Sequence, residues 1–260
     1  MSYENLVLEK EGPVATIALN RPESLNALSM KLRDELQQAL GDVREDTKVR
    51  VLIVTGRGRA FCSGADIREL QTYASGDVPS RAMDMATQRI LGITGLGKPT
   101  IAAINGVAAG GGFSLAMMCD IRLMARSARF VSTFVKRGLI PDGGLTYTLT
   151  QLVGVARAAE LMFTADGVDA EQAEKLGLVN AVVADAELMD AARSLALKIS
   201  QHAPLAVKGT KEAIYLALKG DLKASLEFEA QVQMGLFRTR DFQEGIRSFL
   251  EKREPVFRGE

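Results

Sequence analysis

The sequence has very few of the residues on which side-chain catalysis most often depends. Its 260 residues include one histidine, His202, two cysteines, Cys62 and Cys119, and no tryptophan. A single histidine excludes the zinc sites that use several, so we expect no metal. A serine or cysteine nucleophile would need His202, which precedes Pro204 at a predicted helix start, where a surface or capping role is expected. Two cysteines form no disulfide framework, which fits a reducing compartment.

Excess positive charge is also absent, since Lys+Arg and Asp+Glu are both 32 and the formal net charge is zero. Nucleic-acid binding needs a basic excess or aromatic platforms, and aromatic residues are only 5% of the chain, so we expect no nucleic-acid partner. The N-terminus shows no signal-peptide pattern. The longest uncharged run, residues 100–119, contains Asn105 and four glycines, which favours a buried strand, turn and helix over a membrane span. The expected location is the cytoplasm.

Strands and helices are predicted to alternate up to about residue 184, followed by an almost wholly helical tail with stops at Pro204, Gly220 and Pro255. The expected strands are residues 4–9, 13–19, 51–54, 100–104, 121–125 and 178–183. The expected helices begin at Ser29 and near Asp66 and cover residues 79–93, 112–119, 145–163, 169–176 and 223–239. This order predicts an α/β protein. The tail helix at 223–239 is more apolar than one face of a monomer needs, which indicates packing between subunits.

Two glycine-rich loops, residues 56–66 and 105–113, each follow a buried strand and open a helix. The first is no dinucleotide fingerprint, because the third glycine of that pattern would fall at Phe61. The second lacks the lysine of a phosphate loop after Gly111, and Ala116 breaks the nucleophile-elbow pattern around Ser114. Unpaired N–H groups at two helix starts, facing one point, would form an oxyanion hole. The alternative is that these glycines only allow close packing of helix on strand.

Several further motifs accompany the loops and extend over nearly the whole chain. They are Asn20-Arg21-Pro22, residues 25–28, 61–67, Lys98-Pro99, 105–112, Cys119-Asp120, 138–144, Ala173, 177–179 and 244–255. In these motifs, and in the order of the two glycine loops, the chain resembles the crotonase family, the enoyl-CoA hydratase/isomerase superfamily.

The resemblance implies a fold, a site and an assembly. The fold would be a spiral of ββα turns, with residues 1–200 forming the core that carries the CoA-ester site. Residues 201–260 would form a helical region through which subunits make a homotrimer or a dimer of trimers. The backbone N–H groups of Ala65 and Gly111 would hold the thioester oxygen of an acyl-CoA substrate.

The resemblance also places the coenzyme A moiety, which belongs to the substrate, so that no separate cofactor is expected. It would lie along residues 65–68 (Ala65, Asp66, Ile67 and Arg68), with Ala27 close by. Arg21, Arg68 and the Lys252-Arg253 pair could meet its phosphates, although each alone could equally be a solvated surface charge.

The chain departs from the family's hydratases at both catalytic glutamates. Ser114 takes the place of one and Phe134 that of the other; serine is a poor acid or base with no histidine to activate it, and phenylalanine is inert. Asp142, within Pro-Asp-Gly-Gly, matches the aspartate that family isomerases use as a single acid/base; by itself it would be read as a turn residue. The apolar neighbours Phe134, Leu139 and Ile140 are expected to desolvate it. Asp66, Glu69 and Asp84 are rival carboxylates.

The predicted function is therefore isomerisation of an enoyl-CoA thioester, or of a ring epoxide, by proton transfer through Asp142. The resemblance is closest to the phenylacetate-pathway type. One alternative is a hydratase with an atypical acid/base. Another is a non-catalytic protein that binds CoA esters or a macromolecular partner.

Overall fold

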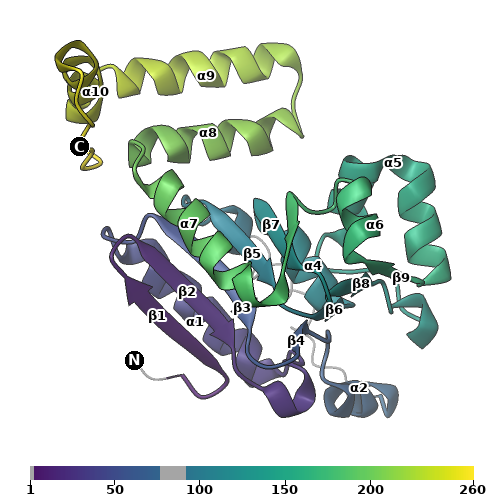
Figure 1. Cartoon of the computed structure of the whole chain (residues 1–260). Coiled ribbons are helices and arrows are strands. Elements are labelled where there is room, and N and C mark those ends of the chain that lie inside the picture. The colour runs from purple at the N-terminus through teal and green to yellow at the C-terminus, as the bar shows by residue number, and fades with distance from the viewer. Residues whose placement is uncertain (1–2, 77–91) are drawn as a thin grey trace.

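The computed structural model describes residues 3–76 and 92–260, and its strands form two sheets (Figure 1). The larger sheet has the order β1-β2-β3-β5-β7-β10, and the smaller has the order β4-β6-β8-β9. The larger sheet contains β1 (Leu6–Glu11), β2 (Val14–Leu19), β3 (Val51–Gly56), β5 (Thr100–Ile104), β7 (Ile121–Ala125) and β10 (Ala181–Val183). The smaller contains β4 (Ala60–Cys62), β6 (Val107–Ala109), β8 (Arg129–Val131) and β9 (Gly167–Asp169).

The larger sheet is parallel except at its first pair. The strands β1 and β2 form the predicted hairpin, in which Leu6 pairs with Leu19 and the chain turns at Gly12, whose φ is +56°. Every residue of β2, β3 and β5 is buried, as expected for strands covered on both faces. The last strand is shorter than the predicted 178–183 because only residues 181–183 pair with β7.

The smaller sheet was not predicted, because two of its strands lie inside what the sequence indicates to be glycine-rich loops. Each strand has three residues, which is too short to show an alternating pattern. The strands β4 and β6 pair in parallel, with Ala60 opposite Val107 and Cys62 opposite Ala108. The two glycine loops are therefore held side by side by the sheet itself.

A strand of the larger sheet, a strand of the smaller sheet and a helix recur in this order along the chain. The three successive units are β3-β4-α2, β5-β6-α4 and β7-β8-α5. This repetition is the predicted α/β spiral of ββα turns, which is confirmed. Its helices are α1 (Met30–Glu45), α2 (Ile67–Ala74), α4 (Gly111–Met117), α5 (Leu145–Thr164), α6 (Ala170–Lys175) and α7 (Leu188–Ser200).

Several helix predictions hold in detail. Ser29 caps α1 by accepting a hydrogen bond from the backbone N–H of Leu32, whose side chain is buried with Leu36, Leu40 and Val43. Helix α5 matches the predicted 145–163, but it contains a kink at Gly154, where φ is +74°. A helix is also expected at residues 79–93, of which residues 79–91 lie outside the described part of the chain.

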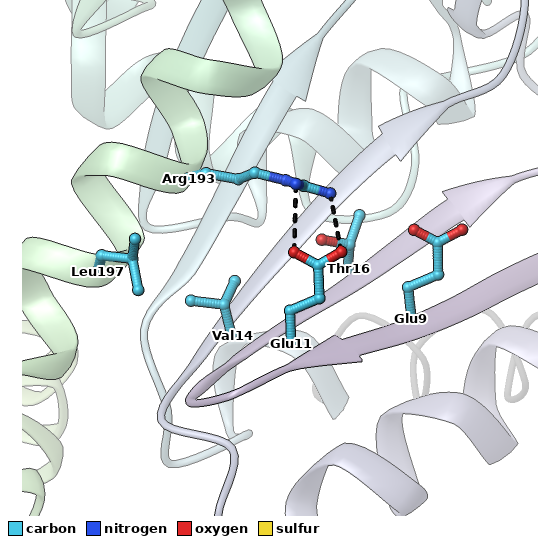
Figure 2. A pocket seen from close by; sticks show the side chains of 6 residues that line it. All are labelled: Glu9, Glu11, Val14, Thr16, Arg193 and Leu197. Carbon is cyan, nitrogen blue, oxygen red and sulfur yellow. Dashed lines mark hydrogen bonds and ion pairs between the residues drawn. The ribbon is translucent and has the colours of Figure 1, made fainter.

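Helix α7 packs on one face of the larger sheet, against β2, β3, β5 and β7. Figure 2 shows Arg193 of α7 reaching Glu11 at the end of β1 with two guanidinium nitrogens, at 3.2 and 3.4 Å from the carboxylate oxygens. The cavity beside this pair measures about 50 Å³, which is too small for a metabolite.

We expect the Arg193→Ala variant to lose less than about 1 kcal/mol of unfolding free energy, because exposed ion pairs contribute little. Urea unfolding followed by circular dichroism would measure it. A loss of several kcal/mol would mean that Arg193 fastens α7 to the hairpin.

The C-terminal helices α8 (Pro204–Ala217), α9 (Leu222–Leu236) and α10 (Arg240–Glu251) follow α7. Helices α8 and α9 lie side by side, away from the smaller sheet (Figure 1). Large apolar side chains of α9 and α10 are widely exposed in the single chain, among them Leu222, Leu226, Met234, Phe249 and Leu250. No helix in the described ranges is long and apolar enough to cross a membrane.

Candidate active site

The first glycine loop turns one backbone N–H group away from the protein. Leu28 donates its N–H to the carbonyl oxygen of Gly64 at 2.7 Å and accepts from the N–H of Asp66 at 3.4 Å. The residues on both sides of Ala65 thus bond to Leu28, so the N–H of Ala65 points to the opposite side. It has no acceptor in the described part of the chain.

The second glycine loop supplies a neighbouring N–H group. Gly111 is the first residue of α4, so its N–H has no partner within the helix. A Cβ atom built on Gly111 would lie 4.0 Å from the nitrogen of Ala65, and one built on Gly64 would lie 3.2 Å from the nitrogen of Gly111. The two N–H groups predicted as a pair therefore lie next to each other, an arrangement that can stabilise negative charge on a carbonyl oxygen.

Close packing explains other glycines of the same loops. A Cβ atom on Gly112 would lie 2.1 Å from the carbonyl oxygen of Cys62, so any side chain there would force α4 away from β4. Gly64 and Gly110 have φ values of +95° and +50°, which favour glycine. Close packing therefore accounts for Gly112, while the role of the N–H groups of Ala65 and Gly111 stays a prediction.

The predicted coenzyme A segment is organised by Arg21. Its guanidinium donates to the carbonyl oxygen of Ala27 at 2.5 Å and to the carboxylate of Asp66 at 2.9 Å. Asp66 also caps α2 by accepting from the N–H of Arg68. Burial raises the pKa of Asp66, but the bonds from Arg21 and Arg68 outweigh burial and hold it below the usual aspartate value. Arg21 therefore positions the segment from within, while Ile67 and Arg68 are exposed.

Of the other cationic candidates for phosphate contact, Arg253 makes ion pairs with Glu244 and Glu251. It fastens the C-terminal tail to α10 in the single chain.

Asn26 is a structural residue of this site that the sequence analysis did not single out. It is fully buried with φ of +57°. Its side chain accepts from the N–H of Arg21 and donates to the carbonyl oxygens of Arg57 and Ala60. This joins the Arg21 loop to β4, next to Ala27. A buried asparagine in the left-handed region signals such a joint, but the two carbonyl groups to which it donates are more than thirty residues away in sequence.

The two positions that carry glutamates in family hydratases have other contacts here. Ser114 is buried, and its hydroxyl donates to the backbone carbonyl oxygen of Asp142 at 2.8 Å. Phe134 is also buried, and the tip of its ring lies 4.0 Å from a Cβ atom built on Gly110. Ser114 therefore holds the loop that contains Asp142, and the ring of Phe134 fills space beside Gly110, next to the N–H pair.

Asp142 lies between β8 and α5, and its carbonyl oxygen accepts from Ser114 and from the N–H of Leu145. The backbone of Asp142 is therefore held against Ser114, which lies one turn from Gly111 on α4. The expected desolvation is wrong for the single chain, because Asp142 is exposed and Leu139 and Ile140 are 47% and 79% exposed. Only Phe134, of the three apolar neighbours, is buried.

Among the rival carboxylates, Asp66 caps α2 and Glu69 lies in the first turn of α2, so both are helix-start residues as expected. Glu69 accepts from the N–H of Met30, at the start of α1, at 2.7 Å through one oxygen, while its other oxygen is buried and has no hydrogen-bond partner among the described residues. Asp84 lies outside the described residues. Within the described ranges no cluster of His, Cys, Asp and Glu could hold a metal ion. His202 is exposed just before α8, in the surface position expected of it.

The two-sheet spiral of ββα turns is the crotonase fold, which solved enoyl-CoA hydratase structures share. The chain belongs to the enoyl-CoA hydratase/isomerase family, whose model matches residues 9–260.

Relatives named as hydratases and a relative named as an isomerase are both similar to this chain over nearly its full length. The short-chain-enoyl-CoA hydratase of Clostridium acetobutylicum is 39% identical over 98% of this chain and 97% of that protein. The 1,2-epoxyphenylacetyl-CoA isomerase of Escherichia coli is 38% identical over 98% and 99%. A crystal structure of enoyl-CoA hydratase from Bacillus anthracis superposes with a TM-score of 0.93 at 38% identity, covering 99% of this chain and 100% of that one.

Proposed function

We propose that the protein is an enoyl-CoA isomerase that moves a double bond in an acyl-CoA thioester by proton transfer through one carboxylate. The N–H groups of Ala65 and Gly111 hold the thioester oxygen and stabilise the enolate formed when a proton leaves C2. Asp142 takes that proton and returns it at C4. Coenzyme A lies along Ala27 and residues 65–68.

The observation that carries this proposal is the contact made by Ser114. Adding water to a double bond needs groups that take a proton from water and give one to carbon. Ser114 uses its hydroxyl to hold the Asp142 loop, and Phe134 has no exchangeable proton. Asp142 is therefore the carboxylate left at a family catalytic position. A single carboxylate suits isomerisation, because the proton removed is the proton returned.

The proposal is tested by measuring turnover of a 3-enoyl-CoA and of crotonyl-CoA side by side on one preparation. We expect the first to be converted to the 2-enoyl ester and the second to be hydrated slowly or not at all. Fast hydration without isomerisation would establish the alternative, a hydratase with an atypical acid/base, which most of the relatives' names favour. Binding without any turnover would establish a non-catalytic protein.

A smaller effect is expected from a methyl group placed between the two N–H donors. The Gly111→Ala variant would put its Cβ 3.3 Å from the end of the Leu28 side chain and 4.0 Å from the nitrogen of Ala65. Loss of one oxyanion donor costs about 10²–10³-fold in turnover, so we expect crowding to cost about 10–10²-fold.

The matched control is Gly41→Ala, within α1, where a Cβ atom meets nothing within 4 Å. It should leave turnover unchanged and stabilise the helix slightly. Equal turnover of the two variants in the isomerase assay would show that the N–H pair does not hold the reacting oxygen.

The assembly is proposed to be a homotrimer or a dimer of trimers. The exposed apolar side chains of α9 and α10 support it, since an apolar surface of this extent is uncommon on a monomer. Light scattering at micromolar concentration should give a mass of about three or six chains of 28.0 kDa, and a mass of one chain would contradict it.

We place the protein in the cytoplasm, because its cysteines are free and buried.

A further inference from the structure

A second cavity, of about 210 Å³, lies at the edge of the larger sheet opposite the candidate active site. Its lining includes Arg50, just before β3, and Lys98, just before β5. The glycine loops of the candidate active site follow the other ends of the same strands. Five residues of strand β5 separate the two edges, which is roughly 16 Å. The cavity is therefore distinct from the thioester site.

The cavity is lined by one sign of charge. Its basic residues come from four separate parts of the chain: Arg50, Lys98, His202 with Lys208, and Arg258. Among the described lining residues none is aspartate or glutamate. The whole chain has equal numbers of acidic and basic residues, so this excess is local.

The two innermost cations are held by neutral carbonyl groups and not by carboxylates. Arg50 donates to the carbonyl oxygens of Ser200, at 2.8 Å, and Phe257. Lys98 donates to the carbonyl oxygens of Val43 and Asp46 at the end of α1. These contacts fix both side chains, and the charge of Asp46 compensates that of Lys98 in part. The carboxylate of Asp46 is itself paired with the ammonium of Lys10 at 2.7 Å.

The outer cations are positioned by their backbone and stems. The stem of Lys208 lies against Gly97, 3.5 Å from a Cβ atom built there, and its ammonium is 3.9 Å from Glu212. The backbone N–H of Arg258 donates to Asp241 at 2.7 Å, which fixes the tail beside the cavity. The first turn of α8, which contributes Leu205 to the lining, has no side-chain cap and adds the positive end of its dipole.

We propose that this cavity binds a small phosphoryl anion, of the size of orthophosphate or pyrophosphate, and so fastens the C-terminal tail to the core. Arginine and lysine side chains that line one cavity can recognise phosphoryl oxygens. The volume equals that of about seven liquid waters at about 30 Å³ each, which admits pyrophosphate. The bound anion contacts the core through Arg50 and Lys98, α8 through Lys208 and the tail through Arg258.

The test uses the full-length chain, with calorimetric titration and thermal unfolding in pyrophosphate, orthophosphate or ADP. Sodium chloride of equal ionic strength is the reference. Pyrophosphate should bind once per chain and raise the unfolding temperature above that in chloride. Saturating coenzyme A should leave this binding unchanged. Binding of ADP as tight as that of pyrophosphate would overturn the small-anion assignment, and competition by coenzyme A would show that the anion occupies the thioester site.

Paired charge-removal variants decide whether the cavity is responsible. Lys208→Gln with Arg258→Gln removes two exposed cavity charges and should weaken pyrophosphate binding by tenfold or more, about what one hydrogen bond to a charged group contributes. Lys198→Gln with Lys219→Gln removes two exposed charges outside the cavity and should change nothing. Equal weakening in both double variants, or no pyrophosphate binding at millimolar concentration by the unaltered chain, would overturn the proposal.

Discussion

Replacement of Asp142 by asparagine is expected to reduce isomerase turnover by about 10²–10⁴-fold, because positioned proton transfer contributes that much to a rate. Asparagine keeps the shape and suits the same turn, but its amide is not a base. Folding should be preserved, since Ser114 and Leu145 bond to the backbone carbonyl of residue 142, which the substitution does not change. Affinity for the CoA ester should also hold, because the N–H groups of Ala65 and Gly111 are untouched.

The measurement is initial-rate kinetics on a 3-enoyl-CoA, with circular dichroism to show that the variant is folded. Asp34→Asn, an exposed substitution on α1, is the matched control and should be fully active. A variant that unfolds would indicate a turn residue only. Full turnover by the Asp142 variant would transfer the base to another carboxylate, of which Glu69, with one unpartnered buried oxygen, is the first to test.

The second large effect is expected in stability, at the contact that joins the C-terminal helices to the spiral. Asp120 accepts from the backbone and hydroxyl of Thr100, from the ammonium of Lys211 at 2.8 Å and from the hydroxyl of Tyr215 at 2.7 Å. Lys211 is buried and also donates to the carbonyl oxygens of Ile93 and Lys98. The carboxylate thus neutralises a buried ammonium on α8.

We expect Asp120→Asn to lower the unfolding free energy by about 3–5 kcal/mol, because it leaves a buried lysine without its counter-ion. For a chain of this size this corresponds to a fall in melting temperature of roughly 10 °C. Burial and the charge of Asp120 raise the pKa of Tyr215 far above its usual value, so the hydroxyl stays a donor and cannot replace the lost charge.

Scanning calorimetry of the variant gives the measurement, and Glu171→Gln, which breaks an exposed pair with Lys175, gives the control. The control should lose less than about 0.5 kcal/mol. Combining Asp120→Asn with Lys211→Met should restore part of the loss, because no unpaired charge remains. If the Asp120→Asn variant melts at the same temperature as the unaltered protein, the network does not fasten α8 to the sheet.

The sequence was most informative where the structure repeats a long local pattern. The buried runs of β3 and β5 and the cap at Ser29 follow from burial on both faces and from the spacing of apolar residues. The smaller sheet could not be found this way, because three residues such as Ala60–Cys62 carry no periodicity. Its pairing with Val107–Ala109 depends on segments more than forty residues apart.

The same limit applies to the candidate site. Its most unusual groups are backbone N–H groups, which every residue possesses, so Ala65 and Gly111 were predicted through the family resemblance. Their separation follows from the pairing of β4 with β6. The exposure of Leu139 and Ile140 was also beyond prediction, since apolar composition does not say which surface covers a side chain.

Helix α4 touches both halves of the proposed chemistry within one turn, since Gly111 at its start supplies one N–H group and Ser114 holds the Asp142 loop. The half that grips the carbonyl is main chain, so point mutation seldom removes it. The half that moves protons consists of side chains at positions 114, 134 and 142, each replaceable by a single substitution. An ancestral gene could therefore exchange one reaction for another while retaining its hold on the same thioester. Divergence within such a lineage would then leave little trace in the backbone.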